Sequence, residues 1–295
     1  MTENRYVKLS ERGLITVGGS DRKEFLQGLI SNDIEQVSPE RAIWAALLTA
    51  QGKYLHDFFI VEIDDVFYLD CEAERLMDLG QRLSRFKLRA EVDLGIACGL
   101  GVWACYGPEA LARADLESEP GIARSLVEGT VYCDPRISDI GARAVLSVKS
   151  AAAYWQKLGI EPGSSAAYDR LRISLGLPDG SRDMVVEKAI LLENNFDPLH
   201  GVDWNKGCYV GQELTARTKY RGLIKKRLVP VEISGDTPEI GTQVTSDGRD
   251  AGEVRSLAGG LALALIRLDK LDLSVEKGVP LVAGNATLTP RLPEW

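Results

Sequence analysis

The alternation of hydrophobic and polar residues predicts interleaved strands and helices over the first three quarters of the chain. Residues 13–19 alternate as a half-buried strand does, and residues 20–33 repeat apolar positions at helical spacing behind a capping-box pair, Asp21 and Glu24. Further strand-like runs lie at 42–50, 54–63, 66–72, 90–106 and 130–148, and helix-like runs lie at 73–86, 108–116, 151–160 and 164–178. Because these runs do not alternate as regular βαβ units, the pattern favours an α+β architecture over a doubly wound sheet.

From about Arg227 the pattern changes to short β-rich runs separated by turns. Turn residues stand at Ser246-Asp247-Gly248 and at Gly259-Gly260. This pattern predicts a small all-β domain of roughly 70 residues, for which a barrel is one candidate architecture. A chain of 295 residues is also too long for one ordinary core, so we expect two or three domains.

Composition allows a large buried core and gives no overall attraction to nucleic acid or to anionic membranes. The chain is 45% hydrophobic and 26% charged, with a formal net charge of −8. The longest apolar stretches, such as 261–266, are too short to span a bilayer. The first thirteen residues contain no apolar core of a signal peptide, so we expect a cytoplasmic protein with no membrane partner.

The cysteines do not predict a disulfide framework or a metal site. There are five, they are widely scattered, and none forms a CxxC pair; the chain also has only two histidines. Four of them lie in apolar, strand-like runs, which predicts small buried side chains: Cys71, Cys98, Cys105 and Cys133. Cys208 differs because it lies in a polar loop between Gly207 and Gly211.

The segment 206–227 is basic within an acidic chain. It contains seven lysines and arginines and one acidic residue, Glu213, a net charge of +6. Such a run is most often a solvated face. Beside the cysteine loop it can instead hold an anionic ligand. Direct contact with RNA has less support, since no RNA-binding motif or aromatic interleaving accompanies the run.

The cysteine loop carries a family resemblance. Its sequence resembles the K-G-C-[FY]-x-G-Q-E signature of the YgfZ family, folate-binding relatives of the glycine-cleavage T-protein (aminomethyltransferase), at Lys206, Gly207, Cys208, Tyr209, Gly211, Gln212 and Glu213. The segments FLQGLISNDI, LTAQGKYLHDFFI, YDRLRISLGLPDG and LLENNFDPLHGVDWNKGC also resemble the family, in the same order. The resemblance covers about residues 20–295 and is strongest to the branch tied to iron–sulfur protein maturation.

The resemblance implies a fold with two ferredoxin-like α+β lobes, a C-terminal β-barrel and a central folate channel. The implied domains are an N-terminal lobe over 1–95, a central lobe with the KGCYVGQE loop over 96–222, and the barrel over 223–295.

Cys208 is the first candidate site residue. A cysteine reacts as its thiolate, and a nearby cation such as Lys206 or a helix N-terminus lowers the pKa of the thiol. Gly207 and Gly211 permit positive φ or a close approach of the backbone to a ligand. The functional interpretation is a thiol that responds to redox state or contacts a persulfide, a cluster or a partner. The alternative is a small side chain fitted into a tight loop.

The resemblance also implies that tetrahydrofolate or a one-carbon derivative is the cofactor. A pterin offers N–H donors to a carboxylate and stacks on aromatic rings, and the glutamate tail suits arginine. These needs indicate Glu193 for the pterin, Tyr168 for stacking, and Arg172 and Arg217 for the tail. Core packing is the alternative for Tyr168, and ion pairing is the alternative for the arginines. Arg12 stands where some family members carry another tryptophan implicated in folate contact.

Asp57 matches the second aspartate of the T-protein's Asp-Asp pair, which is tied to its chemistry. The first partner here is His56. A carboxylate beside folate N5 or N10 can manage a proton. The alternative is a strand-end aspartate that caps the backbone.

Three functions therefore compete. The favoured one is a folate-binding accessory protein acting in iron–sulfur cluster assembly or repair and, through such enzymes, in tRNA modification; its partners are iron–sulfur client or assembly proteins. The second is a tetrahydrofolate-dependent aminomethyltransferase, and the third is an RNA-binding module over 206–227. Whether the protein catalyses a reaction is left open by the sequence, and no metal ligand set is expected.

Overall fold

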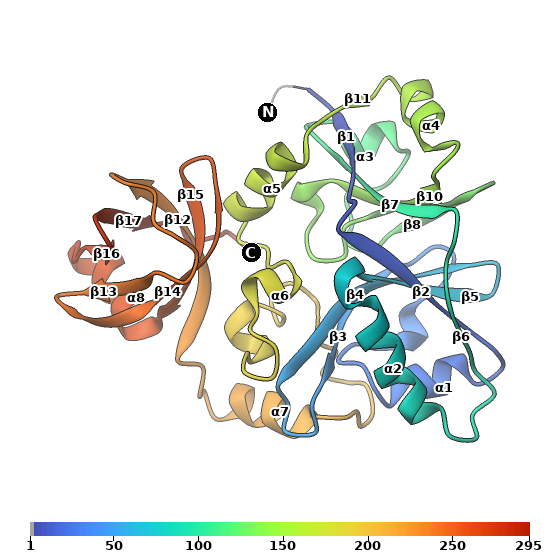
Figure 1. The fold of residues 1–295 in the computed structure, drawn as a ribbon, viewed down its shortest axis with the longest axis horizontal. Coiled ribbons are helices and arrows are strands. Elements are labelled where there is room, and N and C mark those ends of the chain that lie inside the picture. Colours follow the sequence, from blue (N-terminus) through green and yellow to red (C-terminus); the bar gives the residue numbers. More distant parts are fainter. Residues whose placement is uncertain (1–2) are drawn as a thin grey trace. The chain divides into compact units, whose positions relative to one another are not determined.

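A computed structural model describes residues 3–295, which divide into two compact units (Figure 1). Unit 1 comprises the described residues up to 50 together with 55–168 and 199–212. Unit 2 comprises 51–54, 169–198 and 213–295. The three expected domains, with boundaries after residues 95 and 222, stay a prediction.

The first sheet of unit 1 has five strands in the order β3-β4-β5-β2-β6. Its strands are β2 (Arg12–Gly18), β3 (Ile43–Leu48), β4 (Tyr54–Ile63), β5 (Val66–Glu72) and β6 (Asp93–Ile96). Asp64 and Asp65 join β4 to β5 with φ angles of 50° and 61°, as a two-residue type I′ turn requires. The strand-like runs predicted at 54–63 and 66–72 are therefore confirmed and form a hairpin.

Two helices accompany this sheet, α1 (Arg22–Gln27) and α2 (Leu76–Lys87), and α2 packs against β2 and β6. Helix α1 is shorter than the predicted run 20–33, and the capping box does not form. The Asp21 carboxylate accepts a hydrogen bond from the Glu91 N–H at 2.8 Å and leaves the helix N-terminus uncapped. Asp21 therefore ties the start of α1 to the segment before β6.

The second sheet of unit 1 has six strands in the order β11-β1-β7-β10-β9-β8. Its strands are β1 (Arg5–Lys8), β7 (Leu100–Tyr106), β8 (Ala123–Leu126), β9 (Gly129–Cys133), β10 (Ala142–Ser147) and β11 (Glu161–Pro162). Helices α3 (Ala110–Arg113) and α4 (Ala151–Lys157) contribute to its hydrophobic core. In that core the Tyr6 and Trp155 rings stack with their centroids 5.8 Å apart.

Unit 2 contains a closed six-stranded barrel in the order β12-β15-β14-β13-β16-β17, drawn in orange to red in Figure 1. Its strands are β12 (Lys226–Ser234), β13 (Gln243–Ser246), β14 (Arg249–Ala258), β15 (Leu261–Arg267), β16 (Leu281–Ala283) and β17 (Ala286–Pro290). Helix α8 (Leu268–Lys277) follows β15. Closure leaves the barrel no unpaired edge, and the predicted C-terminal barrel is confirmed.

Short helical segments complete the described chain. They are α5 (Ser165–Ser174), α6 (Gly180–Asp183) and α7 (Gln212–Tyr220), with 3-10 turns at Ile34–Gln36, Ala73–Arg75, Ser138–Ile140 and Leu191–Asn194. Helix α5 falls within the predicted run 164–178 and ends before Gly176, whose φ of 74° is outside the helical region.

All five cysteines are free thiols. Three of the four predicted to be buried are buried, and burial raises the pKa of each to about 12: Cys71, Cys105 and Cys133. The prediction for Cys98 is wrong, because this residue is exposed. It lies in the connection between β6 and β7, where Gly99 adopts a φ of 83°, and not within a strand.

Candidate functional site

Lys206 fixes the base of the signature loop, residues 206–213, to the end of α1. Its Nζ donates to three main-chain carbonyls, those of Gln27 at 2.9 Å, Ile30 at 2.7 Å and Asn32 at 2.7 Å. Burial lowers the pKa of Lys206 to about 8, and Asp33 and Asp203 partly offset that effect. All three donors of the ammonium are thus used as a clamp on the backbone.

A second set of hydrogen bonds attaches the preceding segment to the same place. The Asn32 amide donates to the carbonyls of Trp44 at 2.8 Å and His200 at 2.7 Å, and the Ser31 hydroxyl donates to the Gly201 carbonyl at 2.7 Å. The Asp203 carboxylate accepts from the Lys206 N–H at 2.9 Å. Sequence reasoning did not assign this anchoring role to Ser31 and Asn32, whose polar character beside an apolar helix was the available signal.

The thiol of Cys208 is exposed at the tip of the loop. Beside it, Tyr209 is buried, and its ring lies 5.1 Å from the Lys206 Nζ. The Val210 N–H donates to the Gly28 carbonyl at 3.1 Å, so the chain is attached on both sides of the thiol. The cysteine therefore projects from a loop whose ends are fixed.

The two glycines of the loop have different roles. Gly211 has a φ of 83° and directly precedes α7, so its conformation favours glycine. Gly207 is exposed, and an added Cβ there would meet nothing within 4 Å. Gly207 thus leaves open space next to the thiol.

Asp57 and His56 lie on opposite faces of β4, as alternation in a strand requires. Asp57 is buried within the strand and accepts from the Trp44 indole at 3.0 Å. His56 is buried on the other face, 2.8 Å from the Asp78 carboxylate of α2. Burial and then Arg75 lower the pKa of His56 to about 4. His56, which stands in the place of the first aspartate of the T-protein's pair, is therefore neutral at pH 7, and its side chain lies on the opposite face of β4 from Asp57.

Tyr168 belongs to a buried polar network in unit 1. Its hydroxyl accepts from Arg143 at 3.3 Å, and its ring packs against Tyr106 at 5.7 Å. Arg143 also donates to Asp70 at 2.5 Å, and Arg12 donates to the other oxygen of Asp70 at 2.6 Å. Arg12, which stands where some family members carry a tryptophan, therefore forms a buried ion pair with Asp70.

Three guanidinium groups surround the ring of Phe59 in this network. The central carbons of Arg143, Arg136 and Arg12 lie 3.9, 4.9 and 5.7 Å from the ring centroid. Arg136 is paired with the buried Asp134 at 2.8 Å. We call this group, Arg12, Asp70, Asp134, Arg136 and Arg143 around Phe59, the arginine cluster. Sequence reasoning missed it.

The cluster keeps its charges despite burial. Burial by itself would lower the pKa of Arg143, but Asp70 and neighbouring tyrosines outweigh it and the pKa is raised well above its usual value. Burial by itself would raise the pKa of Asp134, but Arg136 outweighs it and the pKa is lowered. Trp44, which holds Asp57, lies 5.7 Å from Arg136, so Asp57 and Tyr168 border the same cluster.

The remaining predicted site residues belong to unit 2. Arg172 is buried and donates to Asp183 at 2.7 Å and to Asp169 at 2.8 Å, so its structural ion pairs are formed. Glu193 is half-buried in the 3-10 turn Leu191–Asn194. Arg217 is exposed on α7, and no ion pair of it is found within residues 3–295.

Two absences are also observed in the described chain. Within residues 3–295, no three His, Cys, Asp or Glu side chains are grouped so as to hold a metal ion. No helix of that same stretch is long and apolar enough to cross a membrane.

The fold defines the class of protein. A solved structure titled glycine cleavage system aminomethyltransferase T, from Bartonella henselae, matches with a TM-score of 0.78 over 99% of this chain and 86% of that chain, at 19% identity. The family described as the CAF17 C-terminal beta-barrel domain matches residues 225–295. The protein therefore has the aminomethyltransferase fold, and the predicted fold class is confirmed.

Curated relatives define the family. The iron–sulfur cluster assembly factor IBA57, mitochondrial, of Mus musculus is 33% identical over 288 residues, which cover 90% of this chain and 78% of the relative. The Homo sapiens protein of that name is 31% identical over 312 residues, covering 98% of this chain and 84% of the relative. The chain belongs to the IBA57 family of iron–sulfur cluster assembly factors. The resemblance predicted from the signature loop is thus confirmed at the level of fold and iron–sulfur branch.

The expected cytoplasmic location is wrong by the same comparison. The relatives from Mus musculus, Neurospora crassa and Homo sapiens are all named as mitochondrial proteins. The expectation rested on the lack of a secretory apolar segment, which distinguishes secretion from retention but does not distinguish cytoplasm from an organelle.

Proposed function

We propose that this protein is an accessory factor in iron–sulfur cluster assembly or repair, with Cys208 as its working thiol. Membership of the IBA57 family bears out the accessory role predicted from the signature loop. The assignment of the thiol is supported above all by its exposure on a loop that Lys206 clamps to α1.

The chemistry of the loop suits this role. Cysteine thiolates are the usual protein ligands of iron–sulfur clusters. A thiolate can also take the outer sulfur atom of a partner's persulfide, and the partner's cysteine then leaves as its thiolate. The open space beside Gly207 lets a bulky reactant reach the sulfur. The iron–sulfur cluster would be a cargo that the protein helps to deliver, and the partner protein would receive it. Any effect on tRNA modification would be indirect, through enzymes that need such clusters.

We further propose that the protein binds tetrahydrofolate or a one-carbon derivative. The proposal assigns the pterin to Glu193 and the anionic tail to Arg217. Tyr168 and Asp57, the other residues implied by the resemblance, are buried in unit 1, where Arg143 and Trp44 already engage them, and they are left out. Glu193 is half-buried and Arg217 is exposed, which suits a ring with N–H donors and a charged tail. Arg172 is left out because Asp169 and Asp183 already engage its guanidinium. When bound, the folate would itself act as a carrier of a one-carbon unit.

The aminomethyltransferase alternative has no observation in its favour at this site. Its chemistry is tied to an acidic pair, and the residue beside Asp57 is a neutral histidine that faces α2.

Complementation tests the role of the thiol. In a strain that lacks this protein, we expect Cys208→Ser to leave iron–sulfur enzyme activity at the deletion level, because serine is a poor ligand for the cluster. Cys98→Ser is the matched control, since Cys98 is the other exposed cysteine of the described chain, and it is expected to restore activity. Full restoration by Cys208→Ser would refute the assignment.

Direct binding tests the folate. Titration of the full chain with tetrahydrofolate should give a saturable signal that weakens at least tenfold in Glu193→Gln, a loss of about 1.4 kcal/mol. Glu187→Gln, an exposed glutamate before the 3-10 turn, is the control. Equal affinity of the natural protein, Glu193→Gln and Glu187→Gln for tetrahydrofolate would show that Glu193 is not part of the site.

A further inference from the structure

The five-stranded sheet ends at β6, whose outer edge is unpaired in the part of the chain that the structure describes. On its inner side β6 pairs with β2 in the register Ile15↔Ile96 and Val17↔Leu94. The Ala97 N–H donates to the Leu14 carbonyl, which sets the phase of the ladder. Because hydrogen-bonded pairs alternate in an antiparallel ladder, Leu94 and Ile96 direct their N–H and C=O groups outward. The Ile96 carbonyl accepts a long, weak hydrogen bond from the exposed Cys98 thiol at 3.9 Å, which an incoming strand would replace.

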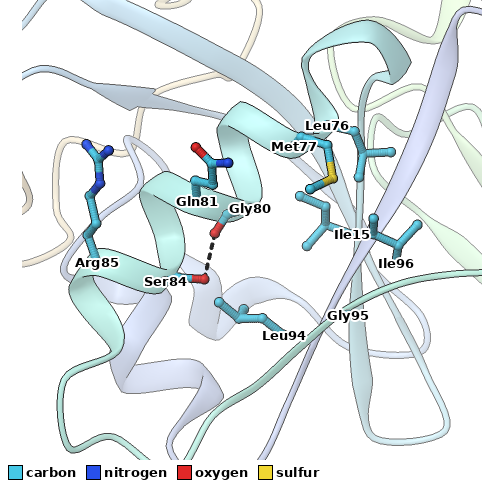
Figure 2. Close-up of a pocket in the computed structure, with 10 residues that line it drawn as sticks. All are labelled: Ile15, Leu76, Met77, Gly80, Gln81, Ser84, Arg85, Leu94, Gly95 and Ile96. Atoms are coloured by element: carbon cyan, nitrogen blue, oxygen red, sulfur yellow. Dashed lines mark hydrogen bonds between the residues drawn. The ribbon is translucent and has the colours of Figure 1, made fainter.

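An apolar groove lies beside this edge, between α2 and β6 (Figure 2). It has a volume of about 410 Å³, and its apolar lining comes from Ile15, Leu76, Met77, Leu94 and Ile96. Met77 is 62% exposed and Ile96 is 54% exposed, so large apolar side chains here face solvent. Apolar side chains gathered along a groove beside an open strand edge can pack against the side chains of an added strand.

The end of the groove away from Met77 is cationic. Arg85 lines it and is exposed, and within residues 3–295 no ion pair of Arg85 is found. Lys87 and Arg89 follow in the chain, also without ion pairs in the same stretch. In Figure 2, Met77 lies toward Ile96 and Ser84 toward Leu94, so α2 and β6 run in opposite directions along the groove.

We propose that this edge accepts an extended segment of a partner protein as a sixth strand. The outward groups of Leu94 and Ile96 hydrogen-bond its main chain, and its apolar side chains at alternate positions fill the groove. A carboxylate on the same face of the segment meets Arg85. The site lies on the first sheet of unit 1, on elements separate from the signature loop, and recognises a partner without involving the thiol.

The geometry favours a partner strand over two other occupants. A small apolar molecule would fill the groove but would leave the main-chain groups of Leu94 and Ile96 to water. A second copy pairing through β6 would align Leu94 with Ile96 of the other copy about Gly95. That arrangement would place the apolar Met77 side chain of the other copy against Arg85, so these two side chains would not be complementary in charge. Only an acidic, apolar strand matches the edge, the groove and the charge together.

The probe is a six-residue peptide, acetyl-Glu-Thr-Val-Thr-Val-Thr-amide, added to the isotope-labelled full chain. We expect slowed amide exchange at Leu94 and Ile96 and a shift of the Met77 methyl resonance, while Met184, fully buried in unit 2, stays unchanged. Two N-methylated versions, one blocked at the valines and one at the threonines, test strand addition. Only one of them should lose binding, because a strand offers alternate amides to its neighbour.

Charge gives the second arm of the test. The peptide with lysine in place of glutamate should bind about fivefold more weakly at low salt. Arg85→Gln should abolish that preference, whereas Lys149→Gln, which changes an exposed cation in the turn after β10, should keep it. Absence of amide protection at millimolar peptide overturns the proposal. A Met77 shift without amide protection assigns the groove to small apolar molecules, and self-association that protects β6 assigns it to a second copy; either result also overturns it.

Discussion

Two polar regions of unit 1 differ in how their charges are held. In the arginine cluster every charged side chain is at least nine-tenths buried, and Asp70 alone serves both Arg12 and Arg143. In the signature loop one lysine is bound by three carbonyls and the thiol two residues later is exposed. The cluster joins strands of both sheets, and its charged groups are paired with one another. The loop has a fixed base and an exposed thiol, which is the arrangement that the proposed contact with an external cluster requires.

The largest expected effect is at the shared carboxylate of the cluster. Asp70→Asn leaves two buried guanidinium groups without a counter-charge, and breaking a buried pair in this way costs about 3–5 kcal/mol. Urea denaturation should show this loss of unfolding free energy. Asp139→Asn is the control. It changes an exposed aspartate in the 3-10 turn Ser138–Ile140 and should change the unfolding free energy by less than about 0.5 kcal/mol. A loss below about 1 kcal/mol for Asp70→Asn would mean that the cluster is hydrated in solution.

The contrast also explains what could be predicted from sequence. The signature loop was found because its eight positions are contiguous, and the barrel followed from turn residues between short β-rich runs. The arginine cluster was missed because its charges come from separate strands and loops. Each charged residue there has the local pattern of a surface position, and its burial arises only where the two sheets meet.

The partners of Lys206 were equally invisible. The lysine was predicted to supply positive charge near the thiol, but its ammonium is bound to carbonyls 174 to 179 residues earlier in the chain. Every residue carries a carbonyl, so a main-chain acceptor leaves no mark in the sequence. The same reason hid the unpaired edge of β6, which is defined by the main-chain groups of Leu94 and Ile96.

The next largest effect is expected at the clamp. Lys206→Met keeps the length of the side chain but removes three donors, and unpaired acceptors of this kind cost about 1–3 kcal/mol. Amide exchange at Val210, whose N–H is bound to the Gly28 carbonyl, should speed up because the loop is no longer held at its base. Lys225→Met, in the same basic run but exposed, is the control. Unchanged exchange at Val210 would show that the other contacts of the loop suffice.

The smallest effect is the pH dependence of that clamp. The pKa of Lys206 is lowered to about 8 in the folded protein, mainly by burial, from an ordinary value of 10.5. Between these two pH values the unfolded chain keeps a proton that the folded chain has released, so stability from this residue rises with pH. Below pH 8 both states hold the proton, and the cost of burying the ammonium is fully present.

The difference in unfolding free energy between the natural protein and Lys206→Met should therefore be constant up to about pH 7 and then change in favour of the natural protein up to about pH 10.5. Partial solvation of the amine keeps this change below about 1 kcal/mol. Groups common to both proteins cancel in the difference, and the Lys225→Met series should stay flat. A change of the opposite sign would show that the three carbonyls stabilise the ammonium more than burial destabilises it.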